Sequence, residues 1–238
     1  LNTYSLARKV GFNNINADLI IGLPKQTIAD VENSVNELVN LKLEHISVYS
    51  LILEEGTMLE ELVRSGKLKL PEDKEERNMY WKVKNILEKN GYNHYEISNF
   101  AKHGSESKHN LDCWKQKEYV GFGVAAHSYT NGVRYSNIEN IEEYIKNYEE
   151  GKEEDNFVFH EKQTHNMKVK EYMMLGLRKI EGVCIQEFKE KFAANPIFVF
   201  KTELEKLVNE ELLEVNGDYI KLTNKGLDLA NLVWEEFV

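Results

Sequence analysis

The sequence predicts an α/β fold followed by a smaller α+β domain. Residues 16–22, NADLIIG, form an apolar run that ends in a Gly-Leu-Pro turn, and residues 45–53, HISVYSLIL, form a second run rich in β-branched side chains. An amphipathic segment lies between the two runs, an order typical of a βαβ unit with parallel strands. A charged break, EEGKEEDN, follows at residues 149–156. We therefore expect domains at residues 1–150 and 151–238.

The expected helix of the βαβ unit has a clear start and a clear apolar face. Thr27 is the expected N-cap, and Asp30, three residues later, takes the place that Glu has in a capping box. The stripe that would face the core is Val31, Val35, Leu38 and Val39. Further helices are expected at residues 57–65, after Pro71 up to Asn90-Gly91, and at residues 138–149, with an extended run at residues 92–100.

The last third of the chain has a different pattern. Helices are expected around residues 161–179, 185–192 and 198–209, before the segment LLEVNGDYIKLT. In that segment Asn216-Gly217 separates two apolar runs, which predicts a β-hairpin, and Thr223 is the expected cap of a last helix to Phe237. Three helices, a hairpin and a helix indicate a winged-helix-like domain.

Charge argues against nucleic-acid binding. The whole chain of 238 residues carries a net charge of −10. Residues 160–238 contain 11 Lys and Arg against 14 Asp and Glu, and the expected recognition helix balances its lysines with glutamates. A DNA-reading module needs a basic face, so we expect a packing or docking domain.

Composition indicates a cytoplasmic protein that neither spans a membrane nor binds to a membrane surface. No window approaches 18 apolar residues, so no membrane span is predicted. The two cysteines, Cys113 and Cys184, are far apart, which is typical of a reducing compartment, and neither forms a cluster-binding spacing. The chain begins without Met and within an expected helix, so we expect it to be part of a longer protein.

Two residues of the βαβ unit are candidates for ligand contact. Asp18 lies in or at the edge of the first strand, where a carboxylate either caps a nearby turn or accepts hydrogen bonds from ribose hydroxyls of a ligand. Ile52 follows the second strand, and packing alone predicts that it is a core residue.

Three further candidates for ligand contact, His109, Cys113 and His127, lie in the segment KHNLDCWKQKEYVGFGVAAHSY. His109 falls in an expected polar loop, where it is either a surface histidine or a ligand for iron or zinc, with Trp114 as a flat apolar wall. Cys113 is either a soft ligand or an inert thiol. His127 follows the small-residue run GFGVAA and is either a satisfied buried histidine or a contact at the mouth of a pocket.

Four motifs in order and spacing resemble one known family. These are NINADLIIGLPKQT, HISVYSLILEEGT, YEISNFAKHGSESKHNLDCW and YVGFGVAAHSYTNGVRYSN. Together they resemble the oxygen-independent coproporphyrinogen III oxidase-like proteins, which are radical S-adenosylmethionine proteins, and most closely their haem chaperone branch. The resemblance implies the C-terminal part of an incomplete (β/α)6 radical S-adenosylmethionine barrel, followed by a winged-helix-like domain. The family's CxxxCxxC cluster motif is not present in this chain.

The resemblance also implies roles for individual residues. Asp18 matches an Asp of the S-adenosylmethionine site, Ile52 a position at the adenine region, and His127 a position beside the nucleotide or substrate pocket. His109, Asn110 and Trp114 match the HNxxYW motif of the haem chaperone branch, whose His is the proposed haem ligand. Cys113 stands where the motif has Tyr, which puts the fine geometry of the haem site in doubt.

Three interpretations of function remain at this level. The first is a haem-binding chaperone that passes haem to an acceptor protein, whose full-length form holds S-adenosylmethionine and a [4Fe–4S] cluster. The second is a coproporphyrinogen III oxidase of porphyrin biosynthesis. The third is an interaction fragment without a ligand. We expect no radical chemistry from this chain alone, and we expect an exposed strand edge to favour aggregation or a homodimer.

Overall fold

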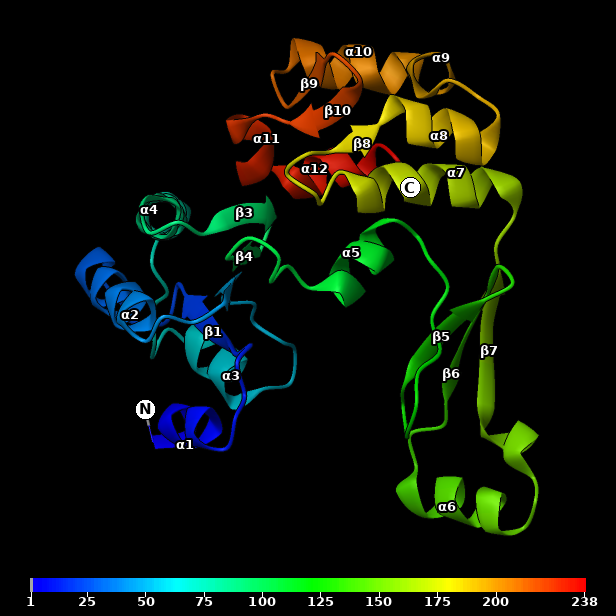
Figure 1. Ribbon diagram of the computed structural model, residues 1–238, viewed down its shortest axis with the longest axis horizontal. Coiled ribbons are helices and arrows are strands. Elements are labelled where there is room, and N and C mark those ends of the chain that lie inside the picture. Colours follow the sequence, from blue (N-terminus) through cyan, green and yellow to red (C-terminus); the bar gives the residue numbers. More distant parts are fainter. Residues whose placement is uncertain (1) are drawn as a thin grey trace. The chain divides into compact units, whose positions relative to one another are not determined.

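The computed structural model describes residues 2–238, and the chain forms two compact units, Leu1–Ser107 and Lys108–Val238. We call them unit 1 and unit 2 (Figure 1). Among the described residues, no helix combines the length and the apolar character that crossing a bilayer requires.

Unit 1 is a four-stranded sheet with helices packed on one face. Its elements are α1 (Asn2–Lys9), β1 (Asn16–Ile21), α2 (Ile28–Asn40), β2 (His45–Ser50), α3 (Met58–Arg64), α4 (Asp73–Lys89), β3 (Asn93–Glu96) and β4 (Asn99–Ala101). The strand order is β1-β2-β4-β3, with β1 and β2 parallel and the other two pairs antiparallel. The expected βαβ unit is therefore confirmed, and the expected extended run at residues 92–100 is a hairpin of two short strands.

Helix α2 begins as the sequence predicts. The hydroxyl of Thr27 accepts a hydrogen bond from the backbone N–H of Asp30, and the Asp30 carboxylate accepts one from the backbone N–H of Thr27 at 2.9 Å. These two bonds complete a capping box. The Thr27 hydroxyl also donates to the Asp30 carboxylate at 2.7 Å, and this bond together with the one from the Thr27 backbone N–H lowers the pKa of Asp30. Val31 and Val35 then point into the core, as the apolar stripe requires.

The core of unit 1 lies between the sheet and the helices α2 and α4. It is built from aliphatic side chains of β1 and β2 and from one face of each helix, and its fully buried members include Ile21, Val31, Val35, Ile46, Met79, Val83 and Leu87. The helices therefore cover one face of the sheet. The opposite face of β1 and β2 is the one available to a ligand.

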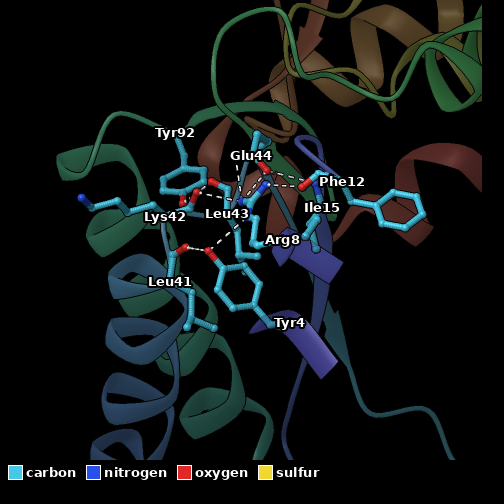
Figure 2. A network of polar contacts seen from close by, with 9 residues as sticks. All are labelled: Tyr4, Arg8, Phe12, Ile15, Leu41, Lys42, Leu43, Glu44 and Tyr92. Carbon is cyan, nitrogen blue, oxygen red and sulfur yellow. Dashed lines mark hydrogen bonds and ion pairs between the residues drawn. The ribbon is translucent and has the colours of Figure 1, made fainter. Parts of the chain in front are cut away.

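Polar contacts attach α1 to the loop between α2 and β2 (Figure 2). The Arg8 guanidinium donates to both carboxylate oxygens of Glu44, at 2.9 and 2.8 Å, and Glu44 also accepts from the backbone N–H of Ile15 at 3.0 Å. Tyr4 donates to the carbonyl of Leu41, and Tyr92 donates to the buried carbonyl of Leu43 at 2.7 Å. These bonds fix the position from which β2 starts.

Unit 2 contains two three-stranded sheets and the remaining helices. Its elements are α5 (Lys108–Trp114), β5 (His127–Thr130), β6 (Val133–Asn137), α6 (Ile141–Glu149), the 3-10 helix η1 (Glu153–Asn156), β7 (Phe157–Lys162), α7 (His165–Gly176), β8 (Val183–Cys184), α8 (Ile185–Phe192), α9 (Pro196–Val199), α10 (Lys201–Asn209), β9 (Leu213–Asn216), β10 (Tyr219–Leu222), α11 (Asn224–Asp228) and α12 (Ala230–Glu235). The sheets have the orders β5-β6-β7 and β8-β10-β9, all antiparallel. The expected helices near residues 138–149, 161–179 and 185–192 are present, and the one near 198–209 is divided into α9 and α10.

The expected hairpin near the C-terminus is present. Strands β9 and β10 pair with Asn216 opposite Tyr219, so Gly217 is the first of two loop residues and has φ +61°. Glycine suits that position because a left-handed backbone there carries no Cβ penalty. Thr223 then caps α11 by accepting from the backbone N–H of Gly226 at 3.0 Å, and the expected last helix is divided into α11 and α12.

The charged segment at residues 149–156 does not separate the two compact units. It leads from α6 through η1 to β7, and β7 pairs with β6 on the other side of the segment. Asn156 is fully buried and accepts a hydrogen bond from the side chain of Asn147 at 2.9 Å. Backbone pairing thus crosses residues 150 and 151, and the compact units divide at Ser107 and Lys108. The expected domains at residues 1–150 and 151–238 stay a prediction.

Candidate functional site

The face of the unit 1 sheet opposite the core carries polar side chains at matched positions. Alternate residues of a strand share a face, and the register sets Asn16 opposite His45, Asp18 opposite Ser47, and Ile20 opposite Tyr49. We call this surface the open face. Asp18 and Tyr49 are exposed on it, whereas Leu19, Ile21 and Ile46 point to the core.

A chain of hydrogen bonds crosses the open face and ends at Asp18. The Tyr95 hydroxyl accepts from the backbone N–H of Ser107 at 3.2 Å and lies 2.7 Å from Nε2 of His45. Nδ1 of His45 lies 2.7 Å from Oδ1 of Asn16, whose amide nitrogen donates to Oδ1 of Asp18 at 2.8 Å. One direction satisfies every member: Tyr95 donates to Nε2, and Nδ1–H donates to Asn16. We call these five residues the relay.

The relay holds its histidine in the neutral form. The His45 side chain is 7% exposed, and burial lowers its pKa, opposed by the carboxylates of Asp18 and Glu106. Burial also raises the pKa of Tyr95 to about 12, so the phenol keeps the hydrogen that it donates. The relay therefore presents one oxygen of the Asp18 carboxylate in a fixed direction and leaves the other for a hydroxyl donor. Asp18 was expected from the sequence, but Asn16, His45 and Tyr95 were not.

Ile52 lies just beyond β2 and is 74% exposed. The expectation from packing alone, that it is a core residue, is wrong. The chain leaves the sheet after Ser50, so the alternation that buries Ile46 and Val48 no longer applies to the residues that follow. An exposed apolar side chain at the end of a strand is available to a ligand instead.

His109 lies on the first turn of α5 in unit 2. The expected polar loop is therefore wrong at this point, because the helix already begins at Lys108. The imidazole is exposed, and one helical turn later the sulfur of Cys113 lies 3.8 Å from its Nε2. Burial raises the pKa of the Cys113 thiol, so this group stays protonated at neutral pH and is a weak ligand.

Trp114 ends α5 and is held from within unit 2. The guanidinium of Arg178 lies 4.4 Å from the centre of the Trp114 ring and 4.6 Å from the centre of the Trp234 ring. This arrangement fixes the end of α5 by cation–π contacts. The ring expected as a wall for a planar ligand is thus engaged with Arg178. Asn110 is half-buried on the same helix.

His127 begins β5 and lines a cavity of about 320 Å³ in unit 2. The other lining residues are Tyr119, Ser128, Arg134, His160 and Glu161. The His127 imidazole is exposed and stacks on that of His160, with ring centres 5.2 Å apart and planes 17° from parallel. The alternative of a buried histidine is wrong, because the side chain opens onto the cavity. His160 carries no motif and could not be recognised from the sequence.

The described residues do not fit an iron–sulfur cluster. Across residues 2–238, no group of three or more His, Cys, Asp or Glu side chains is arranged to hold a metal ion. Cys113 and Cys184 are both free, and each stands apart from further thiols. Cluster ligation normally takes several cysteine thiolates, and Cys113 and Cys184 do not supply such a set.

Comparison with known proteins finds one matching family model and several similar proteins. The family described as the HemN C-terminal domain matches residues 163–229. The chain is 40% identical over 231 residues to the haem chaperone HemW of Lactococcus lactis, covering 97% of this chain and 60% of that protein. It is 39% identical over 240 residues to the haem chaperone HemW of Bacillus subtilis, covering 99% of this chain and 62% of that protein. The chain thus spans about three fifths of the length of these relatives.

A solved structure has the same fold. Coproporphyrinogen III oxidase (HemN) of Escherichia coli, described as a radical SAM enzyme, matches 99% of this chain and 57% of its own, with a TM-score of 0.77 and 19% identity. The fold is therefore the α/β fold of a HemN-type protein. Sequence and structure comparison thus agree that the chain is similar to HemW haem chaperones and shares the fold of HemN.

Proposed function

We propose that this chain is the C-terminal portion of a haem-binding chaperone of the radical S-adenosylmethionine type, which acts in the cytoplasm and passes haem to an acceptor protein. The observation that carries the proposal is the exposed imidazole of His109 on α5, in a segment that resembles the HNxxYW motif. The relatives named haem chaperone align over nearly the whole chain and support the same proposal.

The chemistry of α5 suits a haem iron carried as cargo. An exposed imidazole offers a nitrogen lone pair to the iron, and the neighbouring Cys113 stays protonated and does not compete. The His109 ring also meets the Tyr119 ring edge to face, with centres 6.5 Å apart. We propose that Asn110 and Trp114 support α5, Trp114 through its contact with Arg178.

We propose that the open face of unit 1 belongs to the S-adenosylmethionine region of the longer protein. Asp18, oriented by Asn16, would accept hydrogen bonds from ribose hydroxyls, and the exposed Ile52 would meet the adenine. A [4Fe–4S] cluster of the longer protein would need thiolate ligands beyond Cys113 and Cys184. His127 is the third residue expected in this region, and its surroundings lie in unit 2.

The architecture that goes with this function is also a proposal. We propose that residues 1–150 are the C-terminal part of an incomplete (β/α)6 barrel with an extension, and that residues 151–238 form a winged-helix-like domain. The parallel pair β1 and β2 with its crossover helix α2 supports the first. The sheet β8-β10-β9 beside α8 and α10 supports the second. A homodimer through the edge strand β1 is the expected association of such a chain.

Coproporphyrinogen III oxidase activity is the alternative, and the structure favours it less. Its support is the fold match at 19% identity, which reports architecture and not chemistry. The two functions differ in a direct assay: a reconstituted full-length protein that decarboxylates coproporphyrinogen III under anaerobic conditions would be an oxidase.

Haem titration of this chain tests the proposed function. Adding ferric haem to the purified protein should produce a Soret band, and the His109→Ala variant should lose most of it. His103→Ala is the matched control, because His103 is exposed in unit 1 and belongs to neither candidate site. A band of equal strength in the His109→Ala variant would remove His109 as a ligand, and no band in the wild type would refute haem binding.

A further inference from the structure

The Asn16 side chain lies between two donors and one acceptor that fix its orientation. Its Oδ1 lies 2.7 Å from Nδ1 of His45 and accepts from the Ser47 hydroxyl at 3.2 Å, while its amide nitrogen donates to Oδ1 of Asp18 at 2.8 Å. A carboxylate only accepts hydrogen bonds, so the amide nitrogen has to face Asp18. The amide oxygen then faces His45 and Ser47, and both of those groups have to donate to it.

The far end of the relay is fixed in the same way. The backbone N–H of Ser107 can only donate, and it donates to the Tyr95 hydroxyl at 3.2 Å. Because Nδ1 of His45 carries the proton that Asn16 accepts, Nε2 of the neutral ring accepts from the Tyr95 hydroxyl at 2.7 Å. The rings of His45 and Tyr95 also meet edge to face, with centres 5.7 Å apart. Every hydrogen bond of the relay therefore runs in one direction, from Ser107 to Asp18.

The middle of the relay is buried, whereas its end is exposed. His45 is 7% exposed and Ser47 is 3% exposed, but Asp18 is open to solvent. A buried ring with a partner on each nitrogen has little freedom to rotate, so His45 holds the Asn16 amide in one orientation. A carboxylate on an exposed strand face would otherwise sample several rotamers, and the bond from Asn16 restricts it to fewer.

The surroundings of the Asp18 carboxylate suit a nucleoside. Among the hydrogen bonds of residues 2–238, none is made to Oδ2 of Asp18, so this oxygen can accept from a ribose hydroxyl. Ile20 and Tyr49 pair with each other two positions further along the same face, and both are partly exposed. A ribose bound to Asp18 would therefore have an aliphatic side chain and an aromatic ring beside it for its base.

We propose that His45 is a positioning residue for nucleoside binding: through Asn16 it holds the Asp18 carboxylate in the arrangement that accepts ribose hydroxyls. This inference rests on the proposed function of the open face as part of the S-adenosylmethionine region. Ordering one mobile side chain on binding weakens an affinity by about twofold to tenfold, and the relay orders Asp18 before the ligand arrives.

NMR titrations of the whole chain with adenosine and with 2′,3′-dideoxyadenosine test this proposal. The two nucleosides share the base and differ in the ribose hydroxyls, so the ratio of their dissociation constants isolates the contact with Asp18. The wild-type chain should bind adenosine more tightly, and Asp18→Ala should remove the difference. His45→Leu should reduce the ratio by about twofold to tenfold and leave the affinity for dideoxyadenosine unchanged.

Three further variants separate positioning from support of the fold. His45→Asn is the matched rescue, because asparagine has nearly the shape of leucine but keeps an N–H near the position of Nδ1, so it should retain the wild-type ratio. Tyr95→Phe keeps the ring and removes the hydroxyl that fixes the His45 tautomer, so it should lower the ratio, by less than His45→Leu does. His103→Leu replaces an exposed histidine of unit 1 outside the relay and should match the wild type.

The other outcomes overturn the proposal. An equal loss of affinity for both nucleosides in His45→Leu would show that His45 only supports the fold, and an unchanged ratio, or one that His45→Asn fails to retain, would exclude positioning. If circular dichroism shows that His45→Leu is unfolded, an unchanged ratio in Tyr95→Phe refutes the proposal instead. A wild-type chain that binds neither nucleoside, or binds both equally, would refute the assignment of the open face as well, whereas the haem titration tests haem binding independently.

Discussion

Acidification should destabilise unit 1 through one buried histidine. His94 is 9% exposed, its ring stacks on Phe100 with centres 4.4 Å apart, and its Nε2 lies 3.2 Å from both the Tyr80 hydroxyl and the Ile97 carbonyl. Burial lowers its pKa from 6.5 to about 4. The folded state therefore resists protonation of this ring, whereas the unfolded chain accepts the proton near pH 6.5.

The sign and size of the effect follow from that difference. A group whose pKa is depressed by folding contributes its full stability above the unfolded pKa, and the contribution is lost as the pH falls from 6.5 to about 4. Each pH unit in that window costs about 1.4 kcal/mol. Lowering the pH from 7.5 to 5.0 should thus remove about 2 kcal/mol of the free energy of unfolding through His94 alone.

Urea unfolding at the two pH values measures this contribution. Trp81 lies in unit 1 next to Tyr80, so its fluorescence reports on unit 1 when Trp114 and Trp234 are replaced by Phe in every protein compared. The His94→Gln variant should be less stable at pH 7.5, because the ring stack is lost, but should lose about 2 kcal/mol less than the parent on acidification. His103→Gln is the control and should follow the parent. Equal losses in the parent and in His94→Gln would refute the reasoning.

Three further predictions follow from single contacts. Nitrogen NMR at pH 7 should find His45 neutral with its proton on Nδ1, and Asn16→Ala should abolish this preference for the Nδ1–H tautomer. A proton on Nε2 in the parent would show that the hydrogen bonds of the relay run in the opposite direction. Gly182→Ala should destabilise unit 2 by more than about 1 kcal/mol, because Gly182 has φ +86° and a Cβ would lie 2.2 Å from the Ile220 carbonyl oxygen; an unchanged melting temperature would contradict this. Tyr92→Phe should lower the free energy of unfolding, measured in urea, by about 1–3 kcal/mol, because it leaves the buried Leu43 carbonyl unpaired. An unchanged free energy of unfolding would show that water replaces the phenol as the donor.

Local patterns in the sequence predicted most of the secondary structure. The capping box at Thr27 and the hairpin at Gly217 depend on contacts between residues a few positions apart, and both are present. The parallel pairing of the first two strands follows from the helix between them, because a βαβ crossover returns the chain in the same direction. The position of the compact-unit boundary did not follow, because the pairing of β6 with β7 joins residues on both sides of a charged segment.

The candidate site residues likewise divide into those that neighbouring residues identify and those that only distant contacts bring together. The motif around His109 identified that histidine from neighbouring residues, although the sequence placed it in a loop and the structure places it on a helix. His160 lies 33 positions after His127, and only the bulge in β7 brings the two rings together. Asn16, the direct partner of Asp18 in the relay, is only two residues away, but the next members, His45 and Tyr95, come from β2 and β3, far along the chain.

By itself the sequence predicted the βαβ unit, most helices and the C-terminal hairpin, because each depends on residue types at short and regular spacing. Only the tertiary structure decided that Ile52 is exposed, that Trp114 is engaged by Arg178, and that His127 shares a cavity with His160. These facts depend on strand ends, on a bulge and on packing between distant segments. Side-chain directions at such places are set by contacts across the fold, which no local pattern in the sequence contains.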